Sequence, residues 1–424
     1  MNLRNNKISL VWAVLLLMLS VPLPAQKHLS NPYSRFGLGE MQQRTSQRNR
    51  TLGGAALAYR DPVVVNSSNP ASYTAFDSLS AVVDADVSFG THRLVEASKS
   101  QSGSTIFMDY LSIGLPVSSW WATAFGIRPF SVVSYNYSYE NAGYCSNDWG
   151  EGGVNEIFWG NAFQLFSRLS AGFQFSYLFG TSYRAHELVF SDEEALNLRA
   201  MEESQLKGFM LSTGIQYEQP VGRSLLGFGL AFTPSIPSFV HMNSDAYYLT
   251  YQLSSSLETP ADTLVWDEKE RNLRNRQVRL PSMAGFGISL SKPGKYWVGA
   301  DMEWEGWSRF SVDGAADSLH DSWRISLGAN WVPNASAAQY LKRVTYQFGL
   351  FYRQDEVCFN QMPLRRTGMA LGMDFPMRKN MSRIGVSLES GLYGPASGGI
   401  REQYYRIALH VQLHEKWYQH RKLE

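Results

Sequence analysis

The feature that most constrains the fold is a strict alternation of apolar and polar residues in several short segments. In the segment 169–179, every second residue from Ala171 to Phe179 is alanine or aromatic, and the other face includes Ser170, Gly172, Gln174 and Ser176. The same alternation recurs in segments 226–232, 322–332, 384–389 and 405–413. Because successive side chains of a strand point to opposite faces, each segment is expected to form a strand with one apolar face.

The composition agrees with a membrane protein that crosses the bilayer with strands. Beyond the N-terminus, no apolar run approaches the roughly 20 residues of a transmembrane helix. Mean hydropathy is only −0.24, but a transmembrane barrel alternates its two faces, and averaging hides the apolar one. Charged residues make up 18% of the chain, against a usual value of about 25%. The net charge of +1 does not favour nucleic acid as a partner.

The spacing of the strands and their connections favours an outer-membrane barrel over a soluble sandwich. From Leu79 on we count about 14 strands, an even number as expected for single-chain barrels. They are expected near 79–90, 106–116, 120–137, 154–167, 169–180, 205–218, 224–233, 277–291, 295–305, 321–332, 344–354, 365–374, 382–390 and 402–414. Short links alternate with long, polar, irregular ones at 91–105, 138–153, 181–204, 234–276 and 391–401. A sandwich has no reason to sort its loops in this way, so we predict an all-β, antiparallel transmembrane barrel over residues 79–414.

Aromatic residues also gather at the expected strand ends, where two interfacial girdles of a barrel would lie. They are Trp120, Trp121, Trp149, Trp159, Trp304, Trp307, Trp417 and Tyr418.

The first residues indicate export from the cytoplasm. Arg4 and Lys7 precede an apolar core, and Ala25 ends a segment that is typical of a signal peptide, residues 1–25. No cysteine follows this core, so a lipid anchor is not expected. The two cysteines, Cys145 and Cys358, could form a disulfide or remain two unpaired thiols in loops. Residues 415–424 are expected to form a short basic periplasmic tail.

Residues 26–78 precede the first strand and are rich in glycine, proline and asparagine. Small residues allow backbone to approach a barrel wall closely, and Asn side chains can satisfy turn amides away from water. Irregular backbone at membrane depth is tolerated only when it is buried in protein or faces a cavity. We therefore expect residues 26–78 to form a hatch that plugs the barrel.

This arrangement resembles the FadL/TodX family of outer-membrane transporters for hydrophobic compounds. Members of that family have a 14-stranded barrel and an N-terminal hatch with an Asn-Pro-Ala motif, matched here by Asn69, Pro70 and Ala71. Family members also have a kink in the third strand that opens a lateral gap. The third strand here contains Gly126 and Pro129, which weaken strand packing and remove a ladder donor. These two residues indicate either such a gate or an ordinary bulge.

Charged residues on the expected inner faces have two interpretations. The candidates on the wall are Arg128, Asp301, Arg324 and Arg406, and those on the hatch are Arg35, Arg60 and Asp61. They would either tie the hatch to the wall through ion pairs and hydrogen bonds or form a polar path for a ligand headgroup.

No motif for phosphate binding or hydrolysis is present, and His410 and His414 share one face without a third metal ligand. No enzyme activity, metal or cofactor is therefore expected. The resemblance implies passive uptake of a small hydrophobic ligand by a barrel surrounded by outer-membrane lipids. The alternative is a non-transporting scaffold of a secretion or barrel-assembly complex, with other outer-membrane or periplasmic proteins as partners. The charged loop 234–276 weakens an assignment to long-chain fatty acids.

Overall fold

The computed structural model describes residues 31–96, 99–192, 194–254, 257–265, 273–377 and 381–416. The predicted signal peptide (residues 1–25), residues 26–30 of the predicted hatch, and residues 417–424 of the predicted tail, with Trp417 and Tyr418, lie outside this part of the chain. Among the described residues, no helix combines the length and the apolar character needed to cross a bilayer.

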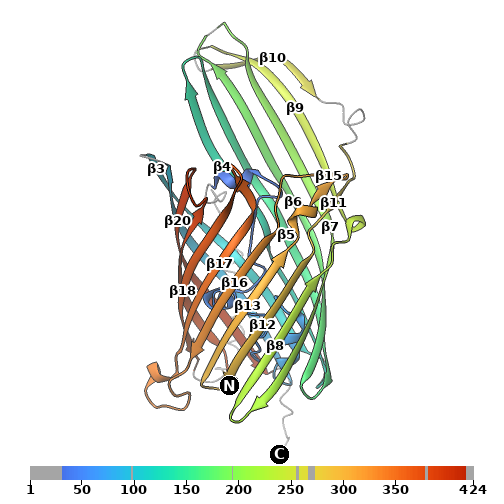
Figure 1. Cartoon of the computed structure of the whole chain (residues 1–424), viewed down its shortest axis with the longest axis vertical. Coiled ribbons are helices and arrows are strands. Elements are labelled where there is room, and N and C mark those ends of the chain that lie inside the picture. The colour runs from blue at the N-terminus through green and yellow to red at the C-terminus, as the bar shows by residue number, and fades with distance from the viewer. Residues whose placement is uncertain are drawn as a thin grey trace, which may run out of the picture.

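Fourteen of the described strands form a closed antiparallel barrel, which confirms the predicted fold class (Figure 1). The barrel closes where β2 pairs with β20, from Ser80 opposite Lys416 to Val95 opposite Arg401. The strands are β2 (Ser80–Glu96), β3 (Lys99–Pro116), β4 (Trp121–Asn141), β5 (Tyr144–Phe166), β6 (Leu169–Phe190), β7 (Asn197–Val221), β8 (Ser224–Thr233), β12 (Met283–Lys292), β13 (Tyr296–Glu305), β16 (Ser322–Trp331), β17 (Thr345–Phe359), β18 (Met362–Pro376), β19 (Arg383–Gly394) and β20 (Arg401–Lys416).

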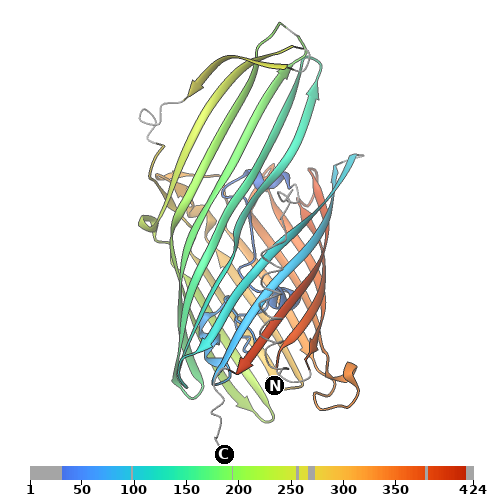
Figure 2. The same ribbon diagram turned by 180° about the vertical axis from the view of Figure 1, so that it is seen from behind.

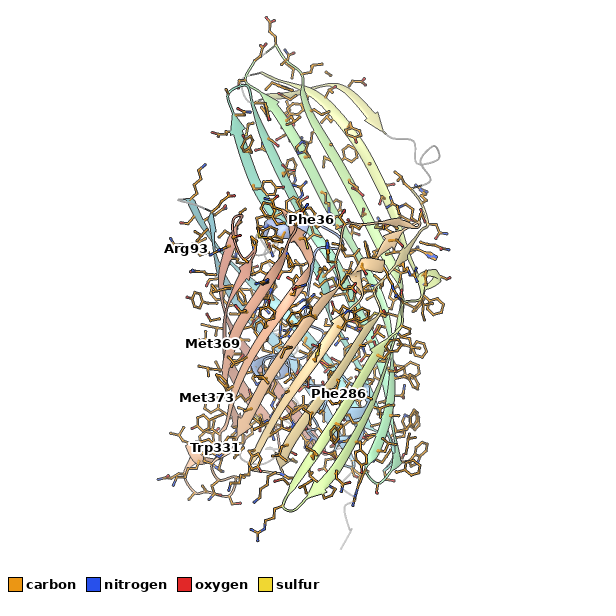
Figure 3. All side chains as sticks on the ribbon, in the orientation of Figure 1. Phe36, Arg93, Phe286, Trp331, Met369 and Met373 are labelled. Atoms are coloured by element: carbon orange, nitrogen blue, oxygen red, sulfur yellow. The ribbon has the colours of Figure 1, made fainter. Side chains whose placement is uncertain are left out.

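The alternation in the sequence separates the two faces of this wall. Ser170, Gln174 and Ser176 of β6 are buried on the inner face. Phe175 and Phe209 point outward and are about half exposed, at 45% and 57%. Phe286, Met369, Met373 and Trp331 likewise lie on the outer surface of the barrel (Figure 3). The apolar side chains that a soluble protein would bury therefore face the lipid here.

On one side, the wall continues far beyond the barrel rim (Figures 1 and 2). We call this part the extracellular wall: the distal parts of β4 to β7, extended by β9 (Val240–Ser254) and β10 (Leu257–Val265). β9 pairs with β7 from Gly208 to Asn197, and β10 pairs with β9. The expectation of irregular loops at 138–153, 181–204 and 234–276 was thus wrong for most of their described residues. It was also wrong for 91–105, where β2 extends to Glu96 and β3 begins at Lys99. In the distal part of β6, charged residues such as Arg184 and Glu187 lie on opposite faces of the strand, so the apolar alternation that marks the membrane-spanning strands is lost there.

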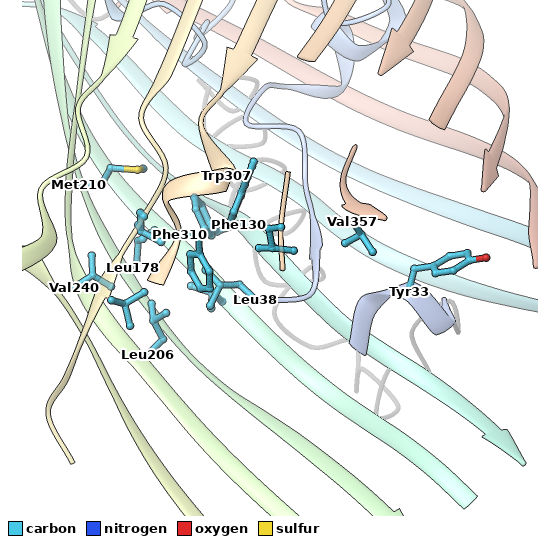
Figure 4. Close-up of a cluster of buried hydrophobic side chains, with 14 of the residues drawn as sticks. Tyr33, Leu38, Phe130, Leu178, Leu206, Met210, Val240, Trp307, Phe310 and Val357 are labelled. Carbon is cyan, nitrogen blue, oxygen red and sulfur yellow. The ribbon is translucent and has the colours of Figure 1, made fainter. Parts of the chain in front are cut away.

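A buried hydrophobic cluster lies where the extracellular wall leaves the barrel (Figure 4). It joins Phe130 of β4, Leu178 of β6 and Leu206 of β7 to Trp307 and Phe310. Trp307 is only 1% exposed, so it belongs to this cluster and not to an interfacial girdle. The short elements around the rim are η3 (Pro237–Phe239), β11 (Arg276–Arg279), η4 (Trp307–Arg309), β14 (Ser311–Val312) and β15 (Ala315–Ala316), and η5 (Tyr340–Arg343) precedes β17.

Residues 31–78, which we call the plug segment, precede β2 and are largely buried against the inner faces of the strands. Its elements are η1 (Pro32–Arg35), β1 (Glu40–Met41), α2 (Gln47–Thr51) and η2 (Pro70–Ala75). Asn31 and Asn69 each cap a 3-10 helix whose first residue is proline, a position where the missing N–H costs nothing.

Candidate functional site

The contacts between the plug segment and the wall form the candidate site, and Asn69 lies at one end of it. Its Oδ1 accepts a hydrogen bond from the Ala71 amide at 3.1 Å. Its Nδ2 donates to the carbonyl oxygens of Ile215 and Leu230, both at 3.2 Å. These two acceptors are wall backbone groups on β7 and β8. One side chain of the Asn-Pro-Ala motif therefore caps η2 and bridges two barrel strands.

Glycines of the wall let the plug backbone approach the strands directly. Gly172, Gly229, Gly328 and Gly349 lie on four different strands. A Cβ atom at any of them would fall under 3.0 Å from a backbone atom of the plug segment. No side chain could stand between plug and wall at these points, so the plug follows the inner surface of the barrel in close contact.

The fully buried carboxylate of Glu156 on β5 joins the plug to the wall. Arg128, one of the predicted residues, donates to both Glu156 oxygens at 3.0 and 2.9 Å. Arg44 of the plug approaches the same carboxylate at 3.2 Å. Arg128 also donates to the Arg44 carbonyl and to the Ser67 hydroxyl of the plug. A single wall carboxylate thus binds two arginines, Arg44 from the plug and Arg128 from the wall.

A second group of charges lies around Arg48 of the plug. Its Nε donates to the Asp374 carboxylate of β18 at 2.8 Å. The predicted residue Asp61 lies 3.3 Å from Arg48 and 3.0 Å from Arg383 of β19. His410 bonds to Asp374 at 2.6 Å. Among the described residues, no group of three or more His, Cys, Asp or Glu could hold a metal ion.

Three more of the predicted residues join the plug segment to the wall. Arg60 pairs with Glu218 at 3.3 Å. The Asp301 carboxylate accepts hydrogen bonds from the Ala56 and Leu57 amides at 2.6 and 2.7 Å. The Arg324 guanidinium donates to the Gly53 carbonyl at 2.7 Å.

The last two predicted residues make weaker or more exposed contacts. Arg35 bonds to the Tyr137 hydroxyl at the rim, where both groups are accessible. Arg406 lies 3.9 Å from Asp109, a carboxylate that Arg50 of the plug approaches at 3.4 Å.

The wall parts next to Gly126 and Pro129. β3 and β4 pair only from Pro116 opposite Ala122 to Leu111 opposite Ile127. Two residues further along β4, the pairing with β5 shifts register between Pro129 and Ser131. Beyond this point β3 leans away from β4, and the start of the plug segment is visible between them (Figure 2).

Two small cavities with both polar and apolar lining lie between plug and wall. One has a volume of about 100 Å³ and is lined by Arg44, Glu303 and Arg353 among others. The other has about 60 Å³ and is lined by Glu40, Glu402 and Arg366 among others. Both volumes are well below the roughly 300–1,000 Å³ that sites for small molecules usually measure. A larger apolar hollow of about 860 Å³, around Phe173 and Phe286, is on the outer surface of the barrel.

Charges in the extracellular wall form a cluster of a different kind. Arg199 bonds to Glu187 and lies 2.9 Å from Glu258, whose side chain is 48% exposed. Burial alone would raise the pKa of Glu187, but hydrogen bonds from Asn147, Tyr251 and Arg199 hold it below its ordinary value. Partial burial and the bond to Glu187 raise the pKa of Tyr251 to about 12.

Sequence reasoning did not identify Arg44, Arg48, Glu156 or Asp374, which form ion pairs between plug and wall. The available signal was the clustering of arginines in the plug segment, at positions 44, 48 and 50. Three arginines within seven residues of a segment expected inside a barrel require carboxylates on the wall. Which carboxylates these are depends on strands far away in the sequence.

A family model described as BamG matches residues 7–424 of the chain. No curated protein matches the sequence. Among solved structures, a Pseudomonas aeruginosa FadL homologue superposes with a TM-score of 0.61 at 11% identity, covering 90% of this chain and 100% of the other. The P. putida toluene transporter TodX gives 0.59 at 14% identity, covering 88% and 98%. The monoaromatic hydrocarbon channel CymD gives 0.58 at 13% identity, with the same coverage. These likenesses confirm the FadL-like fold that the sequence predicted.

Proposed function

The chain belongs to the BamG family, and from its locked interior we propose that it is a non-transporting scaffold subunit of an outer-membrane protein assembly. The observation that carries the proposal is the attachment of the plug segment. Several separate carboxylates of the wall, among them Glu156, Asp374 and Asp301, bind plug groups while they are buried.

Moving the plug far enough to open a passage would break these contacts together. Removing one partner of a buried ion pair costs about 3–5 kcal/mol, because the other charge is left without compensation. At the wall glycines the plug backbone also packs directly against the strands. The plug therefore supports the barrel as a structural core, in the place that a hydrophobic core takes in a soluble domain.

The extracellular wall supports a role in binding other proteins. It carries exposed aromatic side chains such as Tyr139 and Tyr183, at 60% and 44%. Aromatic residues are enriched at protein interfaces, since they contribute large contact areas at low entropic cost.

Uptake of small hydrophobic compounds is the second candidate. It is favoured by the fold that the chain shares with structures described as toluene transporters and hydrocarbon channels, and by the parting of the wall at Pro129. In this case the plug segment would have to shift, because the cavities of about 100 and 60 Å³ beside it are too small for such a passage.

Native mass spectrometry of the full chain, released from its membrane in mild detergent, distinguishes the scaffold role from uptake of hydrophobic compounds. A defined larger assembly without a small adduct supports the scaffold. A monomer with an apolar adduct of a few hundred daltons contradicts it and supports uptake. A second measurement is the uptake of an apolar fluorescent probe by vesicles that contain the full chain or a variant of it. The control is Pro333→Ala, a proline just after the end of β16. Under the scaffold proposal Pro129→Ala leaves uptake at the level of this control, whereas a lateral exit requires Pro129→Ala to change it.

A further inference from the structure

A second hollow on the outer surface of the barrel extends across β16 to β20 and has a volume of about 600 Å³. Near its centre, Ser390 of β19 pairs with Met369 on one side and with Tyr405 on the other. Directly paired residues share a face, and Met369 and Tyr405 are 52% and 54% exposed, so all three face the lipid. The short Ser390 side chain leaves the space between its larger neighbours open. Most other lining residues are apolar or aromatic, among them Leu327, Leu350, Tyr352 and Leu392.

Three arginines lie on the same face of the wall, nearer to the end of the barrel that carries the extracellular wall. They are Arg93 of β2, Arg365 of β18 and Arg401 of β20, and all three are exposed. Arg365 precedes Met369 by four residues on β18, which keeps it on the same face and about 13 Å away along the strand. In Figure 3, Arg93 lies above Met369 on the same side of the barrel. The arginines thus border the apolar hollow on its extracellular side.

A glycine separates two of these arginines. Arg365 pairs with Gly394 of β19. A Cβ atom at Gly394 would lie 3.2 Å from the Cα and 3.5 Å from the Cγ of Arg401. Gly394 therefore lies between the two arginines and leaves the place between them without a side chain. Two strand spacings separate the backbones of Arg365 and Arg401 by about 10 Å, so their long side chains can bind one anionic group from both sides.

The positive charges of these arginines are not balanced by acidic side chains. In the part of the chain that the structure describes, none of the three forms an ion pair. Arg401 donates to the Ala396 carbonyl at 2.6 Å, and Arg93 to the Ser100 hydroxyl at 3.4 Å. Residues paired with Arg365 and Arg93 on the same face are uncharged: Gln354, Gly394 and Gln403. In the lumen, by contrast, Arg44 meets a carboxylate. The outer cluster is therefore complementary to an anion from outside the chain.

We propose that the hollow and the three arginines together form a binding site for a phosphorylated lipid in the extracellular leaflet of the membrane. The acyl chain lies in the hollow along Met369, and the headgroup phosphate lies between Arg365 and Arg401. A guanidinium binds phosphate through two parallel N–H groups, which suits a phosphate held from two sides. A neutral lipid would leave the arginines without a counter-charge, and a free phosphate would leave the hollow unfilled. The inference goes beyond the proposed scaffold role and does not depend on it.

The test is native mass spectrometry of the full chain, freed of lipid in mild detergent and titrated with two probes. Dioleoyl phosphatidic acid carries the phosphate, and dioleoylglycerol has the same acyl chains without it. The wild type should bind phosphatidic acid at least about tenfold more tightly, the size expected for hydrogen bonds to a charged group. Equal binding of the two probes would overturn the inference. Displacement of phosphatidic acid by an equal concentration of inorganic phosphate would also overturn it, because the acyl chain would then contribute nothing.

A double variant of the two arginines beside the glycine locates the phosphate. Arg365→Gln with Arg401→Gln should weaken phosphatidic acid binding at least about tenfold and leave dioleoylglycerol binding unchanged. The matched control, Arg168→Gln with Arg223→Gln, removes two exposed arginines in turns at the opposite end of the barrel. An equal loss in this control would mean general charge attraction and would contradict the site.

A variant that fills the hollow tests the place of the acyl chain. Ser390→Phe should weaken binding of both lipids, whereas Leu371→Phe, on the lipid-facing surface outside the hollow, should not. Heat-induced mobility change on a gel checks that each variant keeps its barrel. Unchanged binding in Ser390→Phe would overturn the inference. So would a partner protein that the wild type retains on extraction and the double arginine variant loses, since this face would then be a protein interface.

Discussion

Charged residues are held in different ways inside the barrel and in the extracellular wall. In the lumen, Glu156 is fully buried and accepts hydrogen bonds from Arg44 and Arg128. In the extracellular wall, Arg199 bridges Glu187 to Glu258, which remains half exposed. If the contacts of Arg199 break, water can solvate its charged partners. Water cannot do so for Glu156, because a charge buried without its partner cannot be solvated. The contacts in the lumen are thus costly to break, whereas those in the extracellular wall can rearrange when another molecule binds.

The largest expected effect is in the lumen. Glu156→Ala leaves two arginines without their carboxylate and should lower the free energy of unfolding by about 3–5 kcal/mol. The matched control, Glu258→Ala, removes a half-exposed partner and should cost less than about 1 kcal/mol. Urea unfolding of the chain in detergent, followed by tryptophan fluorescence, measures both. Similar losses in the two variants would remove the distinction between the regions.

Close packing of the plug gives the next effect. A Cβ at Gly349 would collide with the backbone of Gly53 and Leu52 in the plug. Gly349→Val should therefore cost about 1–3 kcal/mol, the usual penalty of overpacking. Gly143 lies in the extracellular wall with open space around it, so Gly143→Val should stay within about 0.5 kcal/mol of the wild type. The midpoint of heat-induced mobility change on a gel reports both, and an unshifted Gly349→Val would show that the plug can move aside.

The cluster around Arg199 should give a smaller and local effect. Arg199→Met keeps the packing of the aliphatic stem and removes the hydrogen bonds to Glu187 and Glu258. We expect a loss of about 1 kcal/mol, seen as roughly fivefold faster amide exchange in the distal parts of β7 and β9. Exchange in the membrane-spanning strands should not change. If it does, the extracellular wall and the barrel unfold as one unit.

Acid should loosen the extracellular wall through Glu187. The folded-state pKa of this carboxyl lies below its unfolded value of about 4.3. Its contribution to stability is therefore complete above that value and is lost as the pH falls through the folded pKa. Amide exchange near Glu187, corrected for the intrinsic pH dependence, should become faster below about pH 4. In Glu187→Gln this increase of the exchange rate at low pH should be absent. An increase of the same size in that variant would mean that another group causes it.

The smallest effect concerns the cysteines. Cys145 and Cys358 are both free thiols, in β5 and β17 and not in loops. Cys145→Ser and Cys358→Ser should each leave the unfolding midpoint unchanged. Alkylation of the denatured wild type without a reductant should label two thiols. A wild type that gains label only after reduction would contradict this.

Much of the barrel could be predicted from local patterns. The segments around Phe173, Leu327 and Ile407 alternate because each strand separates lipid from lumen, and this requirement acts within a few neighbouring residues. The extracellular wall escaped prediction because its strands meet polar surroundings on both faces. Segments such as 181–190 therefore read as loops, although cross-strand hydrogen bonds hold them as strands.

By itself, the sequence determined the barrel, its strand number and the need for a plug rich in glycine and asparagine, since these follow from short-range chemistry. Only the tertiary structure decided which carboxylate meets which arginine. Arg48 and Asp374 are separated by 326 positions, and the pair forms because barrel closure brings β18 beside α2. The same holds for the parting of β3 from β4 beyond Ile127, because pairing between strands is set by register and curvature of the whole wall.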